Sequence, residues 1–322
     1  MPALHDELVA LPDPDAELAH RVARLREDIS VLRLRGAVVA ASGGVDSSLA
    51  LAIAARACGP ERVVAVALPD RHSSSESAEL AQKAAASMGV TQFRVLSVDT
   101  ALMALGCFTD LHTVLERVFG SFDPELHTFR TEFRYDFEIS GSLPGFFAVR
   151  VGQGDEVVRR LRAVDHRALV ATMNLKQRVR SVFTYRVAEE LDYAVLCTTN
   201  RQEKEQGFFV KNGDGSGDVF PLHDLLKSQV RQLATAAGLP PEVAGRPSTT
   251  DTYSAPQSQE SFFFRWNEPS MDLLVAAFDQ GIADDAIGRE LGASPQAIQR
   301  ARALLERRRL LSRRLTASMG AR

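Results

Sequence analysis

Residues 42–48 combine small, flexible and polar side chains in a pattern that suits anion binding. The segment reads Ser-Gly-Gly-Val-Asp-Ser-Ser and lies between an apolar run at 37–41 and a stretch of helical apolar spacing that begins at Leu49. Glycine lets the backbone approach a ligand closely, and the free N–H groups at the start of a helix attract negative charge. The serine hydroxyls can donate further hydrogen bonds. The pattern therefore predicts a phosphate cradle at a strand-to-helix turn.

Asp46 is the residue of this segment that an anion site does not explain. A carboxylate beside phosphates suits a shared divalent cation, because Mg²⁺ is commonly held by one or two carboxylates together with substrate phosphates. The segment lacks the Gly-Lys-Ser/Thr ending of a Walker loop, and it is not a Gly-x-Gly-x-x-Gly turn. It resembles the Ser-Gly-Gly-x-Asp-Ser loop of the N-type ATP pyrophosphatases, which cleave ATP between the α- and β-phosphates. The alternative is an ordinary turn with capping serines, although this set of residues exceeds what a helix cap requires.

Composition limits the classes of function. The chain has 322 residues, a hydrophobic fraction of 45% and a net charge of −3, which predict a full globular core and give no bulk electrostatic support for nucleic-acid binding. The apolar runs are too short to span a membrane, and the acidic N-terminus lacks the features of a signal peptide. The cysteines are three in number and lack metal-ligand spacing. We therefore expect a soluble cytoplasmic α/β protein that binds neither membranes nor nucleic acids.

The elements that must position the loop alternate between strand and helix. This alternation predicts an α/β fold, a doubly wound parallel sheet with flanking helices. Strands are expected at 37–41, 63–68, 93–97 and 194–198, and helices at 15–34, 47–57, 77–88, 172–191 and 225–237.

Two segments depart from this alternation. Residues 105–169 are predicted to be an insertion, in which the aromatic-rich stretch 128–140 pairs with 146–151 as a hairpin. Residues 268–314 are predicted to form a C-terminal helical extension, with helices at 271–280, 283–291 and 294–312. The whole chain, 1–322, is expected to be a single domain.

A second group of polar residues lies between 174 and 227. Cationic and amide side chains follow one another on the predicted helix 172–191, and a polar segment follows the strand at 194–198, at the edge of the sheet where ligands bind. A glycine-rich turn and a lysine at a helix start complete the group, whose members include Asn174, Lys176, Arg178, Arg180, Thr198, Asn200, Glu203, Lys211, Asp214 and Lys227.

With this second group the chain resembles the ammonia-dependent NAD synthetase family of the N-type ATP pyrophosphatases. The resemblance covers residues 15–100 and 170–312, in the same order and at similar spacing. The family's motifs are Pro-x-Arg-x-Ser-Ser-x-Glu-Ser, found here at 69–77, Gly-Asn-x-Lys-Ala-Arg-x-Arg at 173–180, Gly-Thr-x-Asn-x-x-Glu at 197–203, and Gly-Tyr/Phe-Phe-x-Lys-Tyr-Gly-Asp-Gly at 207–215.

The resemblance implies an AMP-forming carbon–nitrogen ligase of NAD biosynthesis. Such an enzyme uses ATP and Mg²⁺ to convert the carboxylate of deamido-NAD to an adenylate, which ammonia attacks to give NAD and AMP, with pyrophosphate as the other product. The family members are homodimers that place the deamido-NAD site across the interface. No glutaminase domain is visible, so free ammonia or a separate glutaminase partner is expected to supply the nitrogen.

The resemblance also assigns roles residue by residue. Asp46 and Glu203 would bind Mg²⁺, and Asp46, Lys211, Lys227 and Arg71 are the expected catalytic residues, since cations near the α-phosphate offset developing charge. The expected ATP-binding residues are Ser42, Gly43, Gly44, Asp46, Ser47, Ser48, Arg71, Thr198 and Lys227. The expected acceptor-binding residues are Asn174, Arg178, Tyr185, Lys211 and Asp214.

Several departures from the family pattern fall on the acceptor half of the chain. Met173 and Cys197 stand where the family has glycine, and Gln259 stands where it has a carboxylate. The family's His-Lys-Arg near the C-terminus is absent, and arginines at 307–309 and 313–314 could substitute for it. An AMP-forming amide ligase that acts on a different carboxylic acid is therefore the second hypothesis.

Two other classes of function stay open at this point. A sulfur transferase of the RNA-modifying pyrophosphatases would use Cys107 or Cys197 as sulfur carrier, although the acidic charge balance and the lack of a paired-cysteine motif argue against it. Residues 283–306 resemble a helix-turn-helix that could read DNA. The alternative for this segment is a pair of helices that pack on the sheet.

Overall fold

The centre of the protein is a four-stranded parallel sheet. A computed structural model describes residues 4–134, 146–152, 157–249, 254–255, 258–259 and 266–316. The strands are β1 (Ala37–Ala40), β2 (Val63–Ala67), β3 (Gln92–Val95) and β7 (Ala194–Leu196), in the spatial order β3-β2-β1-β7. The chain moves from β1 outward to β2 and β3, and later returns to the other side of β1. The crevice between β1 and β7 is therefore the point where the strand order reverses, which is where open α/β sheets bind ligands.

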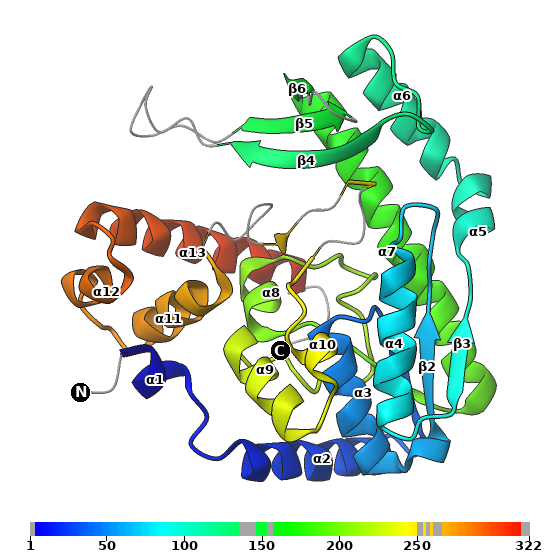
Figure 1. The fold of residues 1–322 in the computed structure, drawn as a ribbon, viewed down its shortest axis with the longest axis vertical. Helices are drawn as coiled ribbons and strands as arrows, with labels where there is room; N and C mark the ends of the chain where they lie inside the picture. The colour runs from blue at the N-terminus through cyan, green and yellow to red at the C-terminus, as the bar shows by residue number, and fades with distance from the viewer. Residues whose placement is uncertain are drawn as a thin grey trace.

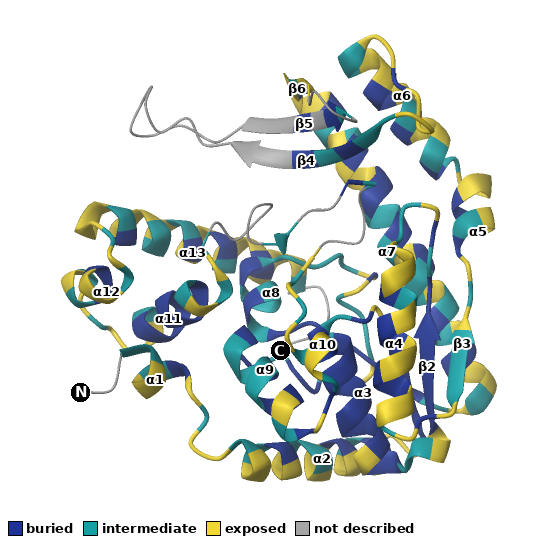
Figure 2. Cartoon of the chain, viewed as in Figure 1, coloured by how far each residue is buried: buried dark blue, intermediate teal, exposed yellow. Residues whose placement is uncertain are grey.

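Helices cover both faces of this sheet, as the near-continuous apolar strands require. One face packs against α2 (Pro14–Val31), α3 (Val45–Cys58), α4 (Ser75–Ser87) and α9 (Lys227–Ala236), which share one hydrophobic cluster with β1 and β2 (Figures 1 and 2). The other face packs against α5 (Asp99–Ala104) and α7 (Ala163–Leu191) through a second cluster. The short helix η1 (Pro60–Arg62) lies between α3 and β2 in the chain, and α10 (Pro241–Ala244) packs against α3, α4 and α9. The predicted doubly wound α/β fold is confirmed.

The predicted strands and helices of this core are confirmed, apart from small shifts at their ends and one longer helix. The helix predicted at 172–191 begins earlier, at Ala163, and so includes the end of the segment predicted as an insertion. Leu169 and Met173 lie one turn apart on the extended part and are both buried in a third cluster. The earlier start of the helix is explained by this packing, since no helix cap is visible in the sequence there.

Residues 105–169 include a helix and a small second sheet, at the top of Figure 1. α6 (Cys107–Phe119) was not predicted, and it packs with the first turns of α7 through the third cluster. β4 (Thr128–Arg134), β5 (Phe146–Gly152) and β6 (Val157–Arg160) form an antiparallel sheet in that order. The pairing of β4 with β5 confirms the predicted hairpin, and its connection at 135–145 lies outside the described residues.

The C-terminal helices pack against α8 (Arg201–Gln206) and α9. They are α11 (Glu268–Asp279), α12 (Asp284–Leu291) and α13 (Pro295–Thr316), joined by α1 (Leu4–Val9) from the other end of the chain. Arg308 donates to Gln206 Oε1 at 2.7 Å, and Arg309 donates to Glu205 Oε2 at 2.5 Å. These two arginines hold α13 on α8, so part of the basic run serves the fold. Among the described residues, α12 and α13 pack on α8 and α11 and not on the sheet, so the expected place of packing is wrong. In the described part of the chain, no helix is long and apolar enough to cross a membrane.

Candidate active site

The loop at 42–48 follows β1 and runs into the first turn of α3. Gly43 has a φ of +71°, and a Cβ there would lie 2.4 Å from the Ser77 carbonyl oxygen, so glycine is required on both counts. The Ser42 and Ser47 hydroxyls lie 3.1 Å apart, and Ser48 Oγ donates to Gly44 O at 2.9 Å. These contacts shape the predicted phosphate cradle before any ligand arrives.

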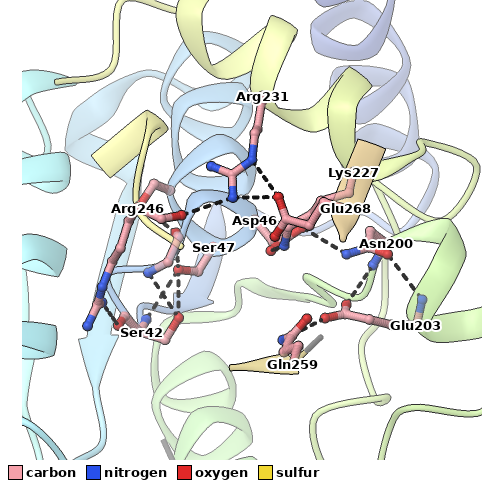
Figure 3. Close-up of polar contacts among 12 residues, drawn as sticks. Ser42, Asp46, Ser47, Asn200, Glu203, Lys227, Arg231, Arg246, Gln259 and Glu268 are labelled. Carbon is pink, nitrogen blue, oxygen red and sulfur yellow. Dashed lines mark hydrogen bonds and ion pairs between the residues drawn. The ribbon is translucent and has the colours of Figure 1, made fainter. Parts of the chain in front are cut away.

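Asp46 lies at the start of α3 and faces residues from two other elements (Figure 3). The Lys227 ammonium, at the first residue of α9, forms an ion pair with Asp46 Oδ2. Asn200, which follows β7, donates from Nδ2 to Asp46 Oδ1 at 3.0 Å. The segments after β1 and β7 thus meet in the crevice where the strand order reverses.

Glu203 completes this cluster through the first turn of α8. Asn200 and Glu203 form a capping box, in which Glu203 Oε2 accepts from Asn200 N at 3.1 Å and Glu203 N donates to Asn200 Oδ1 at 3.1 Å. Burial and the nearby charge of Asp46 raise the pKa of Glu203 to about 8. Burial alone would lower the pKa of Lys227, but Asp46 and Glu203 outweigh it and the pKa is raised. Lys227 therefore keeps its charge, whereas Glu203 is largely protonated at neutral pH and would give up that proton to a bound cation.

The arrangement of two carboxylates fits a magnesium ion shared with phosphates. Asp46 and Glu203 are bridged by Asn200, and Mg²⁺ is usually bound by one or two carboxylates, with phosphates and water filling the remaining positions. Among the described residues, no group of three or more His, Cys, Asp or Glu side chains could hold a metal ion by itself. Any magnesium here would depend on the nucleotide for part of its coordination.

Asp272 on α11 supports Lys227, and sequence reasoning missed it. Asp272 is completely buried and accepts from Lys227 N at 3.1 Å and from Ser228 N at 2.6 Å. It also accepts from the Gln202 amide on α8. One carboxylate thereby fixes the starts of both helices that carry Lys227 and Glu203, and burial raises the pKa of Asp272. Asp272 comes from a helix distant in sequence, and no local pattern marks it.

Arg71 lies at the same edge of the sheet, in the turn after β2. Its guanidinium pairs with Asp99 at 2.6 Å and lies 4.0 Å from the centre of the Phe108 ring. Hydrogen bonding with Asp99 raises the pKa of Arg71 and lowers that of Asp99. The turn bends back through Asp70, whose Oδ1 accepts from His72 N at 2.8 Å. Arg71 is thus held by α5, and among the described residues no hydrogen bond or ion pair joins it to Asp46.

The residues expected at the acceptor lie along α7 and the turn after α8. Arg178 donates to Lys211 O at 3.2 Å, and Asp214 Oδ1 accepts from Val210 N at 2.6 Å, which closes the turn that contains Lys211. Asn174 lies one turn before Arg178 on α7 and is half-buried. The structure therefore brings Arg178 together with Lys211 and Asp214, and leaves Asn174 on the same helix.

Tyr185 and Thr198 lie in different surroundings. Tyr185 is eleven residues beyond Asn174 on α7, about 16 Å along the helix axis, and packs against the second core cluster. Burial raises its pKa to about 12. Thr198 is half-buried directly after β7, at the edge of the sheet that carries Asn200. These surroundings give Tyr185 a packing role, while Thr198 lies at the crevice.

The three departures from the family pattern have separate consequences. Met173 is buried among the residues of the third cluster, where it packs α7 against α6 and β5. Cys197 Sγ lies 3.4 Å from both Thr199 Oγ1 and Asp214 O, so it joins the end of β7 to the turn that holds Lys211. Gln259 donates from Nε2 to Glu203 Oε1 at 3.3 Å. Gln259 is thus the departure that reaches the carboxylate cluster.

A family model and two related proteins all assign the chain to the same family. A family model described as NAD synthase matches residues 17–111 and 149–311, and leaves 112–148 outside. The NH(3)-dependent NAD(+) synthetase of Rhizobium meliloti (strain 1021) is 36% identical over 303 residues, which are 94% of this chain and 90% of that protein. The protein of the same name from Rhizobium rhizogenes (strain K84 / ATCC BAA-868) is 35% identical over 298 residues, 89% of this chain and 86% of its own length.

A solved structure agrees on the fold. The NMN synthetase of Francisella tularensis has a TM-score of 0.60 at 20% sequence identity, and the match covers 86% of this chain and 92% of that one. At this identity the likeness shows the fold alone. The family model and the two relatives cover most of the chain, including both halves of the carboxylate cluster. The chain therefore belongs to the NAD synthase family.

Proposed function

We propose that this protein catalyses the ATP-dependent amidation of deamido-NAD by ammonia, with NAD, AMP and pyrophosphate as products. The observation that carries the proposal is the cluster of Asp46, Asn200, Glu203 and Lys227 beside the glycine loop, where the strand order reverses. The relatives at 35–36% identity are named for the same reaction. The alternative acceptor, a different carboxylic acid, is not favoured by these relatives.

The chain's own residues divide the chemistry between two ends of the site. The glycine loop, with its serines and the first turn of α3, binds the phosphates. Asp46 and Glu203 would hold Mg²⁺, which would supply positive charge to neutralise the leaving pyrophosphate. Lys227, held by Asp46 and Asp272, offsets charge on the phosphates as the acceptor carboxylate attacks the α-phosphorus.

The acceptor end lies over α7 and the turn after α8. Arg178 and Lys211 are cations joined through the Lys211 carbonyl, and such groups suit the phosphates and carboxylate of deamido-NAD. Asn174 shares their helix. Ammonia needs no activation by a dedicated base here, because AMP is a good leaving group. Burial of Cys107 and Cys197 disfavours sulfur transfer, since burial raises the pKa of both thiols.

The wider setting of the enzyme belongs to the same proposal. We place it in the cytoplasm as a homodimer, with ammonia supplied free or by a separate glutaminase. Sedimentation at working concentration tests the dimer, because a monomer with full activity would exclude a site shared between subunits. The residues proposed to bind ATP, magnesium and the acceptor all come from one chain, and an acceptor site across the dimer interface would add residues of the partner subunit.

Pyrophosphate release from MgATP and ammonium tests the function directly. The purified protein is assayed with deamido-NAD, with nicotinate mononucleotide and with a panel of other carboxylic acids. The expected result is rapid release with deamido-NAD and formation of NAD and AMP in equal amounts. Pyrophosphate release with another acid, while deamido-NAD is inert, would mean that the acceptor is that acid and that only the adenylation step was assigned correctly. No release with any acid would overturn the proposal.

A further inference from the structure

Arg246 reaches the glycine loop from a distant part of the chain. It follows α10, and its guanidinium donates to Ser42 O at 3.4 Å and to Ser77 Oγ at 3.0 Å. Figure 3 shows the Arg246 side chain extended toward Ser42. The sequence motifs that mark the ATP site do not include this residue.

The charge of Arg246 is poorly matched by the protein around it. Its side chain is 13% exposed, and the nearest carboxylate is Glu76 at 3.9 Å, which is itself 71% exposed. A guanidinium carries five N–H donors, and a structural arginine usually satisfies several of them with a close carboxylate. Within the part of the chain that the structure describes, Arg246 instead makes one long hydrogen bond to a carbonyl and one to a hydroxyl. A largely buried cation with spare donors beside an anion cradle is arranged to meet an anion.

The backbone that carries Arg246 is held rigidly. Arg231 on α9 donates to Arg246 O at 3.0 Å and to Ala244 O at 2.7 Å. Glu268 on α11 accepts from Arg231 Nε at 2.8 Å, which fixes the Arg231 guanidinium in turn (Figure 3). This chain of contacts starts from the same two helices that position Lys227. Support of this kind places a binding group before the ligand arrives.

We propose that Arg246 binds the β- and γ-phosphates of ATP and retains contact with the pyrophosphate that leaves. This inference rests on the proposed function and adds a phosphate-binding residue to it. In the adenylation step, the acceptor carboxylate oxygen forms a bond to the α-phosphorus and the bond from that phosphorus to the bridging oxygen breaks. The electron pair stays on the pyrophosphate oxygen, and no proton is transferred. Arg246 meets the increased charge with its planar pair of donors.

Calorimetric binding of magnesium pyrophosphate and of AMP tests this role without an acceptor. In Arg246→Gln, the Kd for magnesium pyrophosphate should rise about 10- to 100-fold, because one or two charge-assisted hydrogen bonds are lost. The Kd for AMP should not change, since AMP lacks the β- and γ-phosphates. Arg56→Gln is the matched control: Arg56 lies at the other end of α3 and also donates to a backbone carbonyl, that of Ala237, at 2.9 Å.

The outcomes separate this inference from the proposed function. Unchanged pyrophosphate binding in Arg246→Gln overturns it, as does an equal loss for pyrophosphate and AMP accompanied by a fall in Tm. Absence of pyrophosphate binding in the wild-type protein overturns the proposed function as well. If Arg246→Gln does not fold, Arg246→Lys carries the test: the charge is kept and the planar pair of donors is lost, so pyrophosphate binding should weaken several-fold while AMP binding holds.

Discussion

The protein contains two buried pairs of aspartate and lysine at the same edge of its sheet, with different surroundings. Asp46 pairs with Lys227 beside the glycine loop, and the side chains are 17% and 3% exposed. Asp70 pairs with Lys176 at 3.3 Å in the turn after β2, and both side chains are completely buried. The pairs use the same chemistry, so the difference between them comes from their neighbours.

The neighbours of the two pairs have opposite charge. Glu203 joins the first pair, so two carboxyl groups adjoin one ammonium, and the pKa of Lys227 is raised despite burial. Arg180 joins the second pair, with its Nη2 at 2.9 Å from Asp70 Oδ2, so two cations share one carboxylate. Burial there lowers the pKa of Lys176. The first pair has a second carboxyl group beside it that a metal ion could deprotonate and bind, whereas the second pair is closed within the protein.

The difference in surroundings distinguishes a pair that serves binding from a pair that stabilises the fold. A buried ion pair is weak evidence of stability by itself, but removal of one partner leaves an unmatched charge and is strongly destabilising. An ion pair that has a further carboxyl group beside it and is partly exposed can replace some of its internal contacts with contacts to a ligand. An ion pair that is fully buried cannot do so. We therefore expect Asp46 to matter mainly for activity and Asp70 mainly for stability.

Asp46→Asn should produce the largest effect on activity. The substitution keeps the shape of the side chain and removes a proposed magnesium ligand, so kcat/KM for ATP should fall about 1,000-fold, equivalent to about 4 kcal/mol. The free energy of unfolding should change less than in Asp70→Asn, because Glu203 still accompanies Lys227. Pyrophosphate release and urea unfolding measure the two effects.

The control for this prediction is Asp284→Asn. Asp284 pairs with Arg302 at 2.5 Å between α12 and α13, away from the proposed site. Loss of that carboxylate should leave pyrophosphate release near the wild-type rate. Near-normal release from Asp46→Asn would contradict the assignment of Asp46 to the metal.

Asp70→Asn should produce the largest effect on stability. Lys176 would keep its charge in a fully buried position without its carboxylate, so the free energy of unfolding should fall by about 3 kcal/mol. Urea denaturation measures this. Lys176→Met should cost less, because Arg180 still pairs with Asp70.

The double variant Asp70→Asn/Lys176→Met provides the control. Removal of both partners leaves no unmatched ammonium, so the double variant should lose less stability than the sum of the single variants. Additive losses would mean that the pair is not coupled, and the contrast with Asp46 and Lys227 would fail.

His72, which contacts the pair of Asp70 and Lys176, should make the stability of the protein depend on pH. Its Nδ1 lies 2.8 Å from Lys176 Nζ, and burial, aided by the Lys176 charge, lowers its pKa from 6.5 to about 4. Between these values the unfolded chain binds a proton that the native protein does not, so stability is full above pH 6.5 and falls as pH drops toward 4. His72→Gln should remove about 2 kcal/mol of the loss between pH 7 and pH 5.

His223 offers a matched comparison on the other side of the sheet edge. It lies 3.8 Å from Cys197 Sγ, and burial lowers its pKa to about 4 as well. Urea unfolding at several pH values should show a similar reduction in acid sensitivity for His223→Gln, and additive reductions in the double variant, because the sites do not touch. An unchanged pH curve in His72→Gln would show that the pKa of this histidine is the same in the native and unfolded states, which contradicts the prediction.

The core of the fold could be predicted from the sequence because local patterns encode it. Apolar runs such as 37–41 and 63–68 fix the parallel strands, and helical spacing fixes α2, α3 and α9. α6 was missed although its apolar residues Leu111, Val114, Leu115 and Val118 follow helical spacing, a signal that could have identified it. The early start of α7 has no such signal, because it depends on packing of Leu169 in a cluster whose other members are far away in sequence.

The site was predictable where motifs carry it. Residues 42–48 and Glu203 could be paired because both follow strands that must end at the same edge. The Asn-x-x-Glu spacing of Asn200 and Glu203 also marks a helix start, a signal that could have identified α8. Asp272 and Arg246 could not be found this way: their roles arise only when α11 and the segment after α10 pack beside α9.

Gln259→Glu should produce the smallest effect on activity. It tests whether carboxyl groups beside the pair of Asp46 and Lys227 bind the metal ion. Gln259 donates to Glu203 Oε1 at 3.3 Å, so a carboxylate there adds negative charge beside the proposed magnesium ligands. The magnesium concentration for half-maximal pyrophosphate release should fall by a factor of about 3 to 10, since one added charge in a partly solvated site contributes about 1 kcal/mol. Gln232→Glu is the control, because Gln232 Oε1 accepts from Leu11 N at 2.9 Å and a glutamate can keep that bond away from Glu203. An equal fall in both variants would indicate a general charge effect. A fall confined to Gln259→Glu would locate the metal beside Glu203, at the pair of Asp46 and Lys227 and not at the pair of Asp70 and Lys176.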